Sequence, residues 1–258
     1  MSPATDLGAA VDTLVLDIEG TTSPAAAVHQ TLFGYASARL EEWMDRHAFE
    51  PETARCLEET RERAGLRPDS GNEEVLRVLR TWIKQDVKER PLKTLQGLIW
   101  REGFQRADLH GVVYEDVPPS LRAWRKAGLR CFVYSSGSVQ AQRDWFGHTS
   151  PHGDLTPYLD GHFDLTTAGP KREPGSYRTI ARSVGLDGPG QSARILFCSD
   201  TPAELDAAAE AGWRTCGVRR PGEAVTSQAP EHPWVDDFTA LTPDPNARTV
   251  PLPAKDPR

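Results

Sequence analysis

Residues 13–22 read TLVLDIEGTT, and this stretch decides the fold that the sequence predicts. It places an apolar run directly before a polar turn that contains two acids. Two later runs repeat the order: Arg130–Tyr134 precedes the turn SSGS (135–138), and Arg194–Cys198 precedes the segment SDTPAE (199–204). Short apolar runs separated by helical stretches are typical of buried parallel strands. The sequence therefore predicts an α/β protein with a Rossmann-like, doubly wound parallel sheet.

Helical segments with glycine stops separate these runs. The segment Pro119–Ala127 ends before Gly128, and the segment Ser176–Val184 ends before Gly185. A helix, a glycine, a strand and a polar turn follow one another in the order expected of such a sheet. In doubly wound sheets, ligands bind outside the carboxyl ends of the strands. The polar turns are therefore the candidate site.

The middle of the chain has a different pattern, with little strand signal and much helical periodicity from about Val28 to Gly103. One apolar stripe consists of Leu76, Leu79, Trp82 and Ile83. Glycine and proline positions divide this region into about four helices. The predicted parts of the chain are a core of residues 1–23 and 116–240, an inserted helical cap of residues 24–115, and a flexible proline-rich tail of residues 241–258.

Composition limits the function classes. The chain has 258 residues, enough to bury a core, and a formal net charge of −7. This charge gives no electrostatic reason to expect nucleic acid or an anionic membrane as a partner. No run approaches the roughly 20 apolar residues of a membrane span, and no export signal is visible. The four cysteines lack metal-ligand spacing, so we expect a cytoplasmic protein, which we take to be a monomer.

Acids follow two of the predicted strands. Asp17 projects from the sheet edge, where a carboxylate can attack phosphorus, although such a turn taken alone can be purely structural. Glu19 can offer its backbone carbonyl to a metal or its carboxyl group for proton transfer. Asp200, joined with Asp17 and a carbonyl, supplies hard oxygen donors suited to Mg²⁺. Residues Thr201 to Glu204 are interpreted as a capping box that opens a helix.

Anion-binding groups follow the other predicted strand ends. Ser135 and Ser136 precede a helix expected near Val139, where hydroxyl and N–H groups can hold an anion; a simple serine cap is the structural alternative. Lys171 lies in a Gly-Pro-Lys loop. Its ammonium group can neutralise a phosphoryl oxygen and hold the Asp17 carboxylate in place, although a lone loop lysine is usually solvated. Two acids, two hydroxyls and a lysine together predict metal-assisted phosphoryl transfer.

The order of these motifs resembles the haloacid dehalogenase superfamily and, within it, the enolase-phosphatase (acireductone synthase) family of methionine salvage. The resemblance covers nearly all of residues 11–240. The strings that carry it are LDIEGTT (16–22), LQGLIW (95–100), DVPP (116–119), YSSGSV (134–139), FGH (146–148), GDLTP (153–157), GPK (169–171) and SDTPAELD (199–206).

The resemblance implies a core with an inserted helical cap and one Mg²⁺ per chain. It also implies a small phosphorylated substrate, 2,3-diketo-5-methylthiopentyl-1-phosphate, which is enolised and then dephosphorylated to the acireductone. The implied site residues are Asp17 and Glu19 as catalytic groups, Asp17, Glu19 and Asp200 as metal ligands, and Ser135, Ser136 and Lys171 as the phosphate-binding groups. Glu19 is a candidate for the base of the enolisation.

The sequence departs from the family pattern in three places: the alanines at 25–27, Gly34, and Glu115 in the segment Tyr114–Asp116. They leave the metal and phosphate motifs intact but alter residues expected near the substrate's tail. The alternative hypothesis is therefore a phosphatase of the same superfamily that acts on a different small phosphorylated metabolite.

Two further hypotheses come from other function classes. Carbon–halogen cleavage also uses a strand-end aspartate but needs no metal, and the presence of both Glu19 and Asp200 argues against it. A non-catalytic binding module would leave the combination of Asp17, Lys171 and Asp200 without a purpose.

Overall fold

The computed structural model describes residues 5–6, 11–85, 87–223 and 229–242. The chain divides into two compact units. The first consists of the described residues of Met1–Ala27 and Gly111–Arg258, and the second spans Val28–His110. The insertion predicted from the sequence, residues 24–115, is slightly longer at both ends than this second unit.

A parallel sheet of six strands forms the centre of the first unit, in the order β4-β3-β2-β5-β6-β7. Its strands are β2 (Thr13–Leu16), β3 (Arg130–Tyr134), β4 (Gly161–Phe163), β5 (Ile195–Ser199), β6 (Arg214–Val218) and β7 (Trp234–Val235). Consecutive strands run outward in both directions from β2, so the connections reverse direction between β2 and β5. Ligands of open α/β sheets bind at such a switch point. The predicted doubly wound parallel sheet is confirmed.

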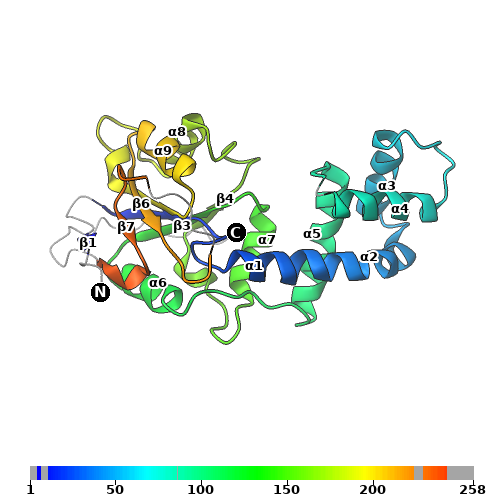
Figure 1. Cartoon of the computed structure of the whole chain (residues 1–258), viewed down its shortest axis with the longest axis horizontal. Helices are drawn as coiled ribbons and strands as arrows, with labels where there is room; N and C mark the ends of the chain where they lie inside the picture. Colours follow the sequence, from blue (N-terminus) through cyan, green and yellow to red (C-terminus); the bar gives the residue numbers. More distant parts are fainter. Residues whose placement is uncertain (1–4, 7–10, 86, 224–228, 243–258) are drawn as a thin grey trace. The chain divides into compact units, whose positions relative to one another are not determined.

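Helices cover both faces of this sheet, with α8 and α9 above it and α6 below it in the view of Figure 1. The helices of this unit are α1 (Ala25–Val28), which ends on the first residue of the second unit, α6 (Val117–Lys126), α7 (Val139–Gly147), α8 (Pro174–Ser183) and α9 (Pro202–Glu210), with 3-10 turns at Thr156–Tyr158, Ser192–Arg194 and Phe238–Ala240. Prolines in the first turns of α6, α8 and α9 favour helix starts there, because the missing N–H has no helical partner at that place.

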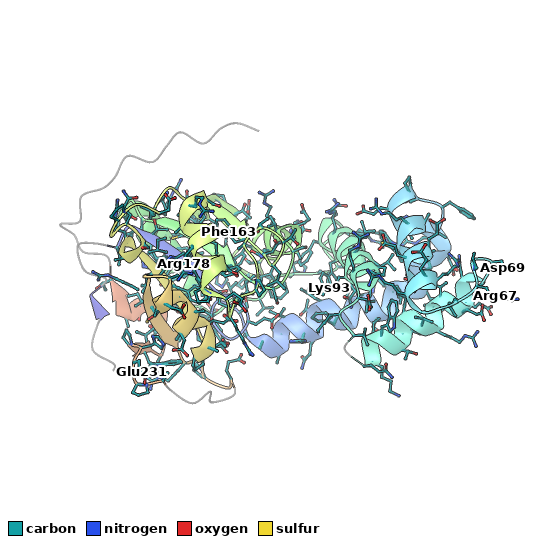
Figure 2. The ribbon with its side chains drawn as sticks, turned by 90° about the horizontal axis from the view of Figure 1, so that it is seen from above. Arg67, Asp69, Lys93, Phe163, Arg178 and Glu231 are labelled. Atoms are coloured by element: carbon teal, nitrogen blue, oxygen red, sulfur yellow. The ribbon has the colours of Figure 1, made fainter. Side chains whose placement is uncertain are left out.

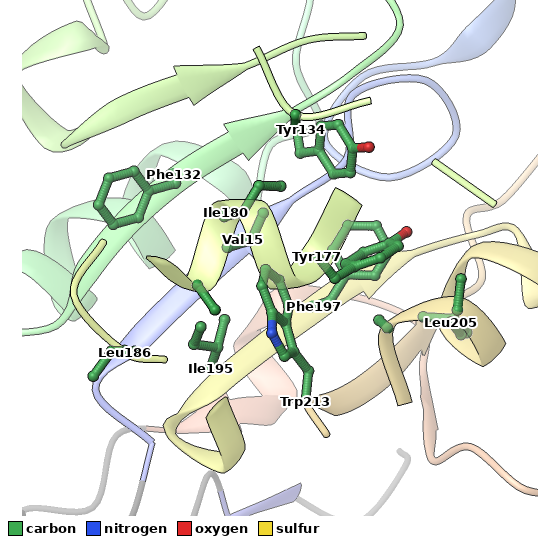
Figure 3. Close-up of a cluster of buried hydrophobic side chains, with 14 residues drawn as sticks. Val15, Phe132, Tyr134, Tyr177, Ile180, Leu186, Ile195, Phe197, Leu205 and Trp213 are labelled. Carbon is green, nitrogen blue, oxygen red and sulfur yellow. The ribbon is translucent and has the colours of Figure 1, made fainter. Parts of the chain in front are cut away.

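The core under α8 and α9 is aromatic. Tyr177 of α8 lies edge-on against Phe197 of β5, at 5.3 Å between ring centroids, and against Trp213, at 5.2 Å. Figure 3 shows these rings together with Val15 and Ile180. Successive side chains of a strand point to opposite faces, so the neighbours of Val15, which are also buried, face the other helical layer. The burial of the central strands β2, β3 and β5 on both faces explains the unbroken apolar runs of the sequence.

The second unit is helical. It consists of a π-helical turn at His29–Phe33 followed by α2 (Gly34–His47), α3 (Pro51–Arg63), α4 (Asn72–Lys84) and α5 (Arg90–Gln105). Leu40, Leu79, Leu95 and Ile99 are buried in its core. Charged side chains cover its surface. Arg67 and Asp69, on the connection between α3 and α4, are an example, with 3.6 Å between Arg67 Nε and Asp69 Oδ1 (Figure 2).

The structure differs from the sequence-based expectation near the end of the chain. The segment predicted as a tail begins with β8 (Leu241–Thr242), which pairs with β1 (Thr5–Asp6). Leu241 is buried, and its carbonyl accepts a hydrogen bond from the indole of Trp124 at 3.1 Å. Residues 243–258 of the predicted tail lie outside the described residues. None of the described helices has the length and hydropathy needed to cross a membrane.

Candidate active site

The strand register brings the polar turns to one edge of the sheet. Leu16 lies opposite both Val133 of β3 and Cys198 of β5. Asp17 therefore follows its strand at the same level as Tyr134 and Ser199, which also end theirs. This edge flanks the switch point between β2 and β5, so the fold gathers these turns at the place where ligands bind.

Asp17 is buried and held by three donors. Its Oδ1 accepts hydrogen bonds from the backbone N–H of Ile18, at 2.7 Å, and from the ammonium group of Lys171, at 2.7 Å. Its Oδ2 accepts one from the hydroxyl group of Ser199 at 3.2 Å. These contacts fix both oxygens of the carboxylate. The Ser199 hydroxyl was not singled out from the sequence, because a serine at the end of a strand has no distinguishing pattern.

Hydroxyl groups fix the loop that carries Lys171. Tyr134 donates to the carbonyl of Gly169 at 2.8 Å, Ser176 to that of Pro170 at 2.7 Å, and Tyr177 to that of Lys171 at 2.7 Å. The two tyrosine hydroxyl groups point the same way in Figure 3. Three consecutive carbonyls are thus satisfied by side chains, so Lys171, whose side chain is only 8% exposed, is held rather than solvated.

The capping box predicted for Thr201 to Glu204 does not form, because the Glu204 carboxylate contacts Lys171 instead. Oε2 of this carboxylate lies 2.6 Å from the Lys171 ammonium and 3.0 Å from the Ser199 hydroxyl, whose single proton can point to Glu204 or to Asp17. Thr201 does occupy the N-cap of α9, but its side chain makes no capping hydrogen bond and donates instead to Asp200 Oδ1 at 3.1 Å. The sequence pattern fits both arrangements. The buried ammonium of Lys171 decides between them, because its three N–H donors need acceptors and Glu204 supplies one beside Asp17.

Asp200 is held against the turn that follows Asp17. Its backbone N–H donates to the hydroxyl of the buried Thr21 at 3.0 Å. Its carboxylate lies against Gly20, where an added Cβ would come within 2.4 Å of Oδ2. Gly20 also has a φ of +68°, which a side chain would disfavour. Glycine is therefore required beside Asp200 both for space and for conformation.

The site contains more carboxylates than cations. Burial lowers the pKa of Lys171, but the charges of Asp17 and Glu204 outweigh this effect and raise it well above its ordinary value. Burial, and next the charge of Asp17, raises the pKa of Glu204 to about 7 and that of Asp200 to about 6. When ionised, the cluster has three negative charges and one positive charge, a net charge of −2. A divalent cation would neutralise it.

The donor set fits Mg²⁺ rather than a metal that requires many side chains. Among the described residues, no three His, Cys, Asp or Glu side chains are grouped as a metal site. The predicted ligands include two carboxylates, Asp17 and Asp200, and the backbone carbonyl of Glu19, so they do not need such a group. Glu19 lies half-buried in the turn that follows Asp17, where its backbone bridges to Ser23. Mg²⁺ is usually bound by one or two carboxylates and several waters.

Hydrogen bonds within the turn after β3, and from Gln142 of α7, hold this turn in place. Ser135 is buried, and its hydroxyl accepts a hydrogen bond from the N–H of Gly137 at 3.3 Å, whereas Ser136 is exposed. The amide of Gln142 donates to the carbonyls of Gly137 and Phe163, both at 2.8 Å. The capping hydrogen bond of α7 comes from Ser138, whose hydroxyl accepts from Ala141 at 3.2 Å. The serine cap is therefore a third residue, and Ser135 and Ser136 stay available for the predicted phosphate site.

Comparison with known proteins agrees with this geometry. Residues 11–212 match the model of the haloacid dehalogenase-like hydrolase family. The chain is 53% identical to enolase-phosphatase E1 of Nocardia farcinica, with 88% of this chain and 95% of that protein covered, and 49% identical to enolase-phosphatase E1 of Streptomyces avermitilis, with 90% and 95% covered. The crystal structure of the UTR4 protein of Saccharomyces cerevisiae superposes with a TM-score of 0.74, at 32% identity over 90% of this chain and all of that one. The chain belongs to the haloacid dehalogenase-like hydrolases and, within them, to the enolase-phosphatase E1 family.

Proposed function

We propose that this protein is a Mg²⁺-dependent enolase-phosphatase of methionine salvage. It converts 2,3-diketo-5-methylthiopentyl-1-phosphate into the acireductone 1,2-dihydroxy-3-keto-5-methylthiopentene and inorganic phosphate. Relatives at 43–53% identity bear the name enolase-phosphatase E1, and they align over most of the chain. The observation that carries the proposal is the buried contact between Lys171 and Asp17, 2.7 Å long, at the switch point of the sheet.

Each residue of the site has a role that follows from its chemistry. Asp17, Asp200 and the carbonyl of Glu19 would hold one Mg²⁺, which supplies a positive charge that polarises the phosphoryl group. Asp17 presents the catalytic carboxylate to phosphorus, and Lys171 fixes this carboxylate and neutralises a phosphoryl oxygen. Glu19 is the candidate for proton transfer during enolisation.

The turn after β3 would bind the phosphate. Ser135 and Ser136 offer hydroxyl groups directly before α7, whose N-terminal N–H groups favour an anion. Gln142 holds this turn at the carbonyl of Gly137. A preformed turn of this kind binds the phosphate without reorganisation.

The proposal is tested with the diketo phosphate itself. Enol absorbance and released phosphate are measured in Mg²⁺ and, as a control, after metal removal with a chelator. We expect both signals in Mg²⁺ and neither with chelator. Strong phosphate release from other monoesters, with none from the diketo phosphate, would instead favour the alternative substrate suggested by Ala25–Ala27. Equal turnover without metal would contradict the metal-dependent mechanism.

We further propose that the protein acts as a monomer in the cytoplasm, with a small phosphorylated metabolite as its partner. Light scattering coupled to size-exclusion chromatography should give the mass of one chain, 28.5 kDa. A mass of twice that value at micromolar concentration would contradict the monomer.

A further inference from the structure

Arg220 is a buried cation next to the candidate site, on the segment that follows β6. Its side chain is only 2% exposed. Its Nη1 donates to both carboxylate oxygens of Asp116, at 2.8 and 2.9 Å, and its Nε donates to the carbonyl of Thr21 at 2.7 Å. The contacts of Arg220 therefore join the end of the sheet to the turn that follows Asp17.

The surroundings of Arg220 fix its position. Its guanidinium group lies 4.4 Å from the ring centroid of Tyr114 and 4.7 Å from that of Phe238. The backbone N–H of Phe238 also donates to Asp116 Oδ2 at 2.7 Å, so the partner of the guanidinium is itself held. A planar guanidinium in contact with two rings and paired with a fixed carboxylate loses little freedom when it binds a third group. That third group is the carbonyl of Thr21.

Thr21 connects this cation to the predicted metal ligand. Its carbonyl accepts from Arg220, and its hydroxyl accepts from the backbone N–H of Asp200 at 3.0 Å. Thr21 is fully buried, so neither contact is replaced by solvent. The carboxylate of Asp200 lies against the neighbouring Gly20, so a shift of this turn would displace the carboxylate.

A second group on the same segment holds the residues beyond Thr21. Glu223 Oε1 accepts a hydrogen bond from the backbone N–H of Ala25 at 3.0 Å and from the hydroxyl of Tyr114 at 2.7 Å. The N–H of Tyr114 in turn donates to the carbonyl of Thr22 at 3.0 Å. The indole of Trp145 also donates to the hydroxyl of Ser23 at 3.0 Å. Residues outside the turn thus hold the segment from Thr21 to Ala25 at several points, and Arg220 is the side chain that binds Thr21, whose hydroxyl accepts from Asp200.

We infer that Arg220 is a positioning residue for the metal site: through Thr21 it holds Asp200 beside Asp17 in the arrangement that binds the cation. Arg220 contacts neither the predicted ligands nor the phosphate-binding groups in any described contact, so it acts through Thr21. This inference rests on the proposed function, since it takes Asp17 and Asp200 as the ligands. It adds to that function a residue that sets metal affinity without touching the metal.

The test measures binding of Mn²⁺, a paramagnetic substitute for Mg²⁺, to the full chain by electron paramagnetic resonance. Arg220→Lys keeps the charge beside Asp116 but lacks the two separate nitrogens, Nε and Nη1, with which Arg220 reaches Thr21 and Asp116 at the same time. We expect its Mn²⁺ dissociation constant to rise about tenfold. The matched control is Arg219→Lys. In the wild type, Arg219 pairs with Asp236 at 2.8 Å on the surface, so the Mn²⁺ dissociation constant of this variant should not change.

Two substitutions of Thr21 test the same connection while leaving the buried cation in place. Thr21→Val keeps the shape of the side chain but removes the acceptor for Asp200, and it should weaken Mn²⁺ binding by a factor similar to Arg220→Lys. Thr21→Ser keeps the hydroxyl and should bind as the wild type does. If the turn had only a structural role, Thr21→Ser and Thr21→Val proteins of equal thermal stability would bind Mn²⁺ with the same affinity.

The outcomes distinguish this inference from the proposed function. If the wild type binds Mn²⁺ and Asp200→Asn does not, the metal site stands; unchanged affinity in folded Arg220→Lys and in Thr21→Val then overturns the positioning role alone. If Asp200→Asn binds Mn²⁺ as tightly as the wild type, the predicted ligand set is wrong, and the inference fails with it. Circular dichroism establishes that each variant is folded; should Arg220→Lys unfold, the Thr21 pair decides.

Discussion

The two units of the molecule differ in one respect: the first unit buries some of its ion pairs, in addition to the exposed pairs that both units have. In the first unit, Lys171 and Arg220 are buried and contact carboxylates that are also nearly enclosed. In the second unit, ion pairs such as Arg80 with Glu41 lie on the surface, with both side chains more than half exposed. The buried ion pairs lie at or next to the candidate site, whereas the exposed pairs lie on a hydrated helical surface.

The physical difference is the cost of desolvation. An exposed pair gains about 0–1 kcal/mol, because water already stabilises both charges. A buried pair gains little over an apolar packing, yet removal of one partner costs about 3–5 kcal/mol, because the other charge is left buried alone. Buried charges in the first unit are therefore expensive to keep, which fits a role in chemistry better than a role in stability.

The largest effect is expected from Lys171→Met. It leaves Asp17 and Glu204 buried without a cation, so stability should fall by about 3–5 kcal/mol. Phosphate release should fall by about 10²–10³-fold or more, as for loss of a single charge-stabilising donor. Urea unfolding and phosphate assays on the folded protein measure the two effects. Activity within tenfold of the wild type would remove Lys171 from the mechanism.

A smaller effect is expected from Tyr177→Phe, which removes the hydroxyl that donates to the carbonyl of Lys171. A buried acceptor left without a donor costs about 1–3 kcal/mol. The control in the other unit is Tyr35→Phe, which removes an exposed hydroxyl that donates to Asp108 at 3.0 Å. We expect urea unfolding to show a clear loss of unfolding free energy for Tyr177→Phe and a much smaller loss for Tyr35→Phe. Equal losses would show that burial does not determine the contribution of these hydroxyl groups.

The third prediction concerns pH. Burial, and next the charge of Arg143, lowers the pKa of His162 from 6.5 to about 4, and no hydrogen-bond partner of its Nδ1 is present among the described residues. The unfolded chain then takes up a proton before the folded chain does as the pH falls. Stability from this residue is complete above pH 6.5 and is lost between pH 6.5 and about 4.

The size of this loss is at most about 3.5 kcal/mol, because each unit of pKa difference corresponds to about 1.4 kcal/mol. Urea unfolding across this pH range should therefore show a smaller loss for His162→Gln than for the wild type. Parallel curves for the two proteins would show that His162 is not responsible.

The smallest effect is expected from Arg80→Ala, which breaks the exposed pair with Glu41 in the second unit. We expect a change in unfolding free energy within about 0.5 kcal/mol and no change in phosphate release. A loss as large as that of Tyr177→Phe would show that the surface pairs contribute more than their exposure suggests.

Much of the fold could be predicted from the sequence because buried parallel strands leave unbroken apolar runs. The strands that became β2, β3 and β5 were predicted within a residue. The outer strands β4, β6 and β7 were not predicted, since β4 has three residues and β7 two, and β6 is partly exposed. The placement of Asp17 and Asp200 at one edge of the sheet could also be expected, because both follow predicted parallel strands. Lys171 reaches Asp17 from a loop between β4 and α8.

Other parts of the site depend on contacts that a linear pattern does not contain. Glu204 fitted a capping box, and only the buried ammonium group of Lys171 shows why its carboxylate points elsewhere. Arg220 and Asp116 lie more than a hundred residues apart and have no motif that joins them. The roles predicted for Ser135 and Ser136 stay predictions, as does that of Glu19.

The central claim is that the strand-end cluster around Asp17 performs the reaction, and Asp17→Asn tests it most directly. The amide keeps the size of the side chain but removes its charge. At saturating Mg²⁺ and diketo phosphate, a folded Asp17→Asn protein should release phosphate at least about 10³-fold more slowly than the wild type. Release within tenfold of the wild-type rate would contradict the account.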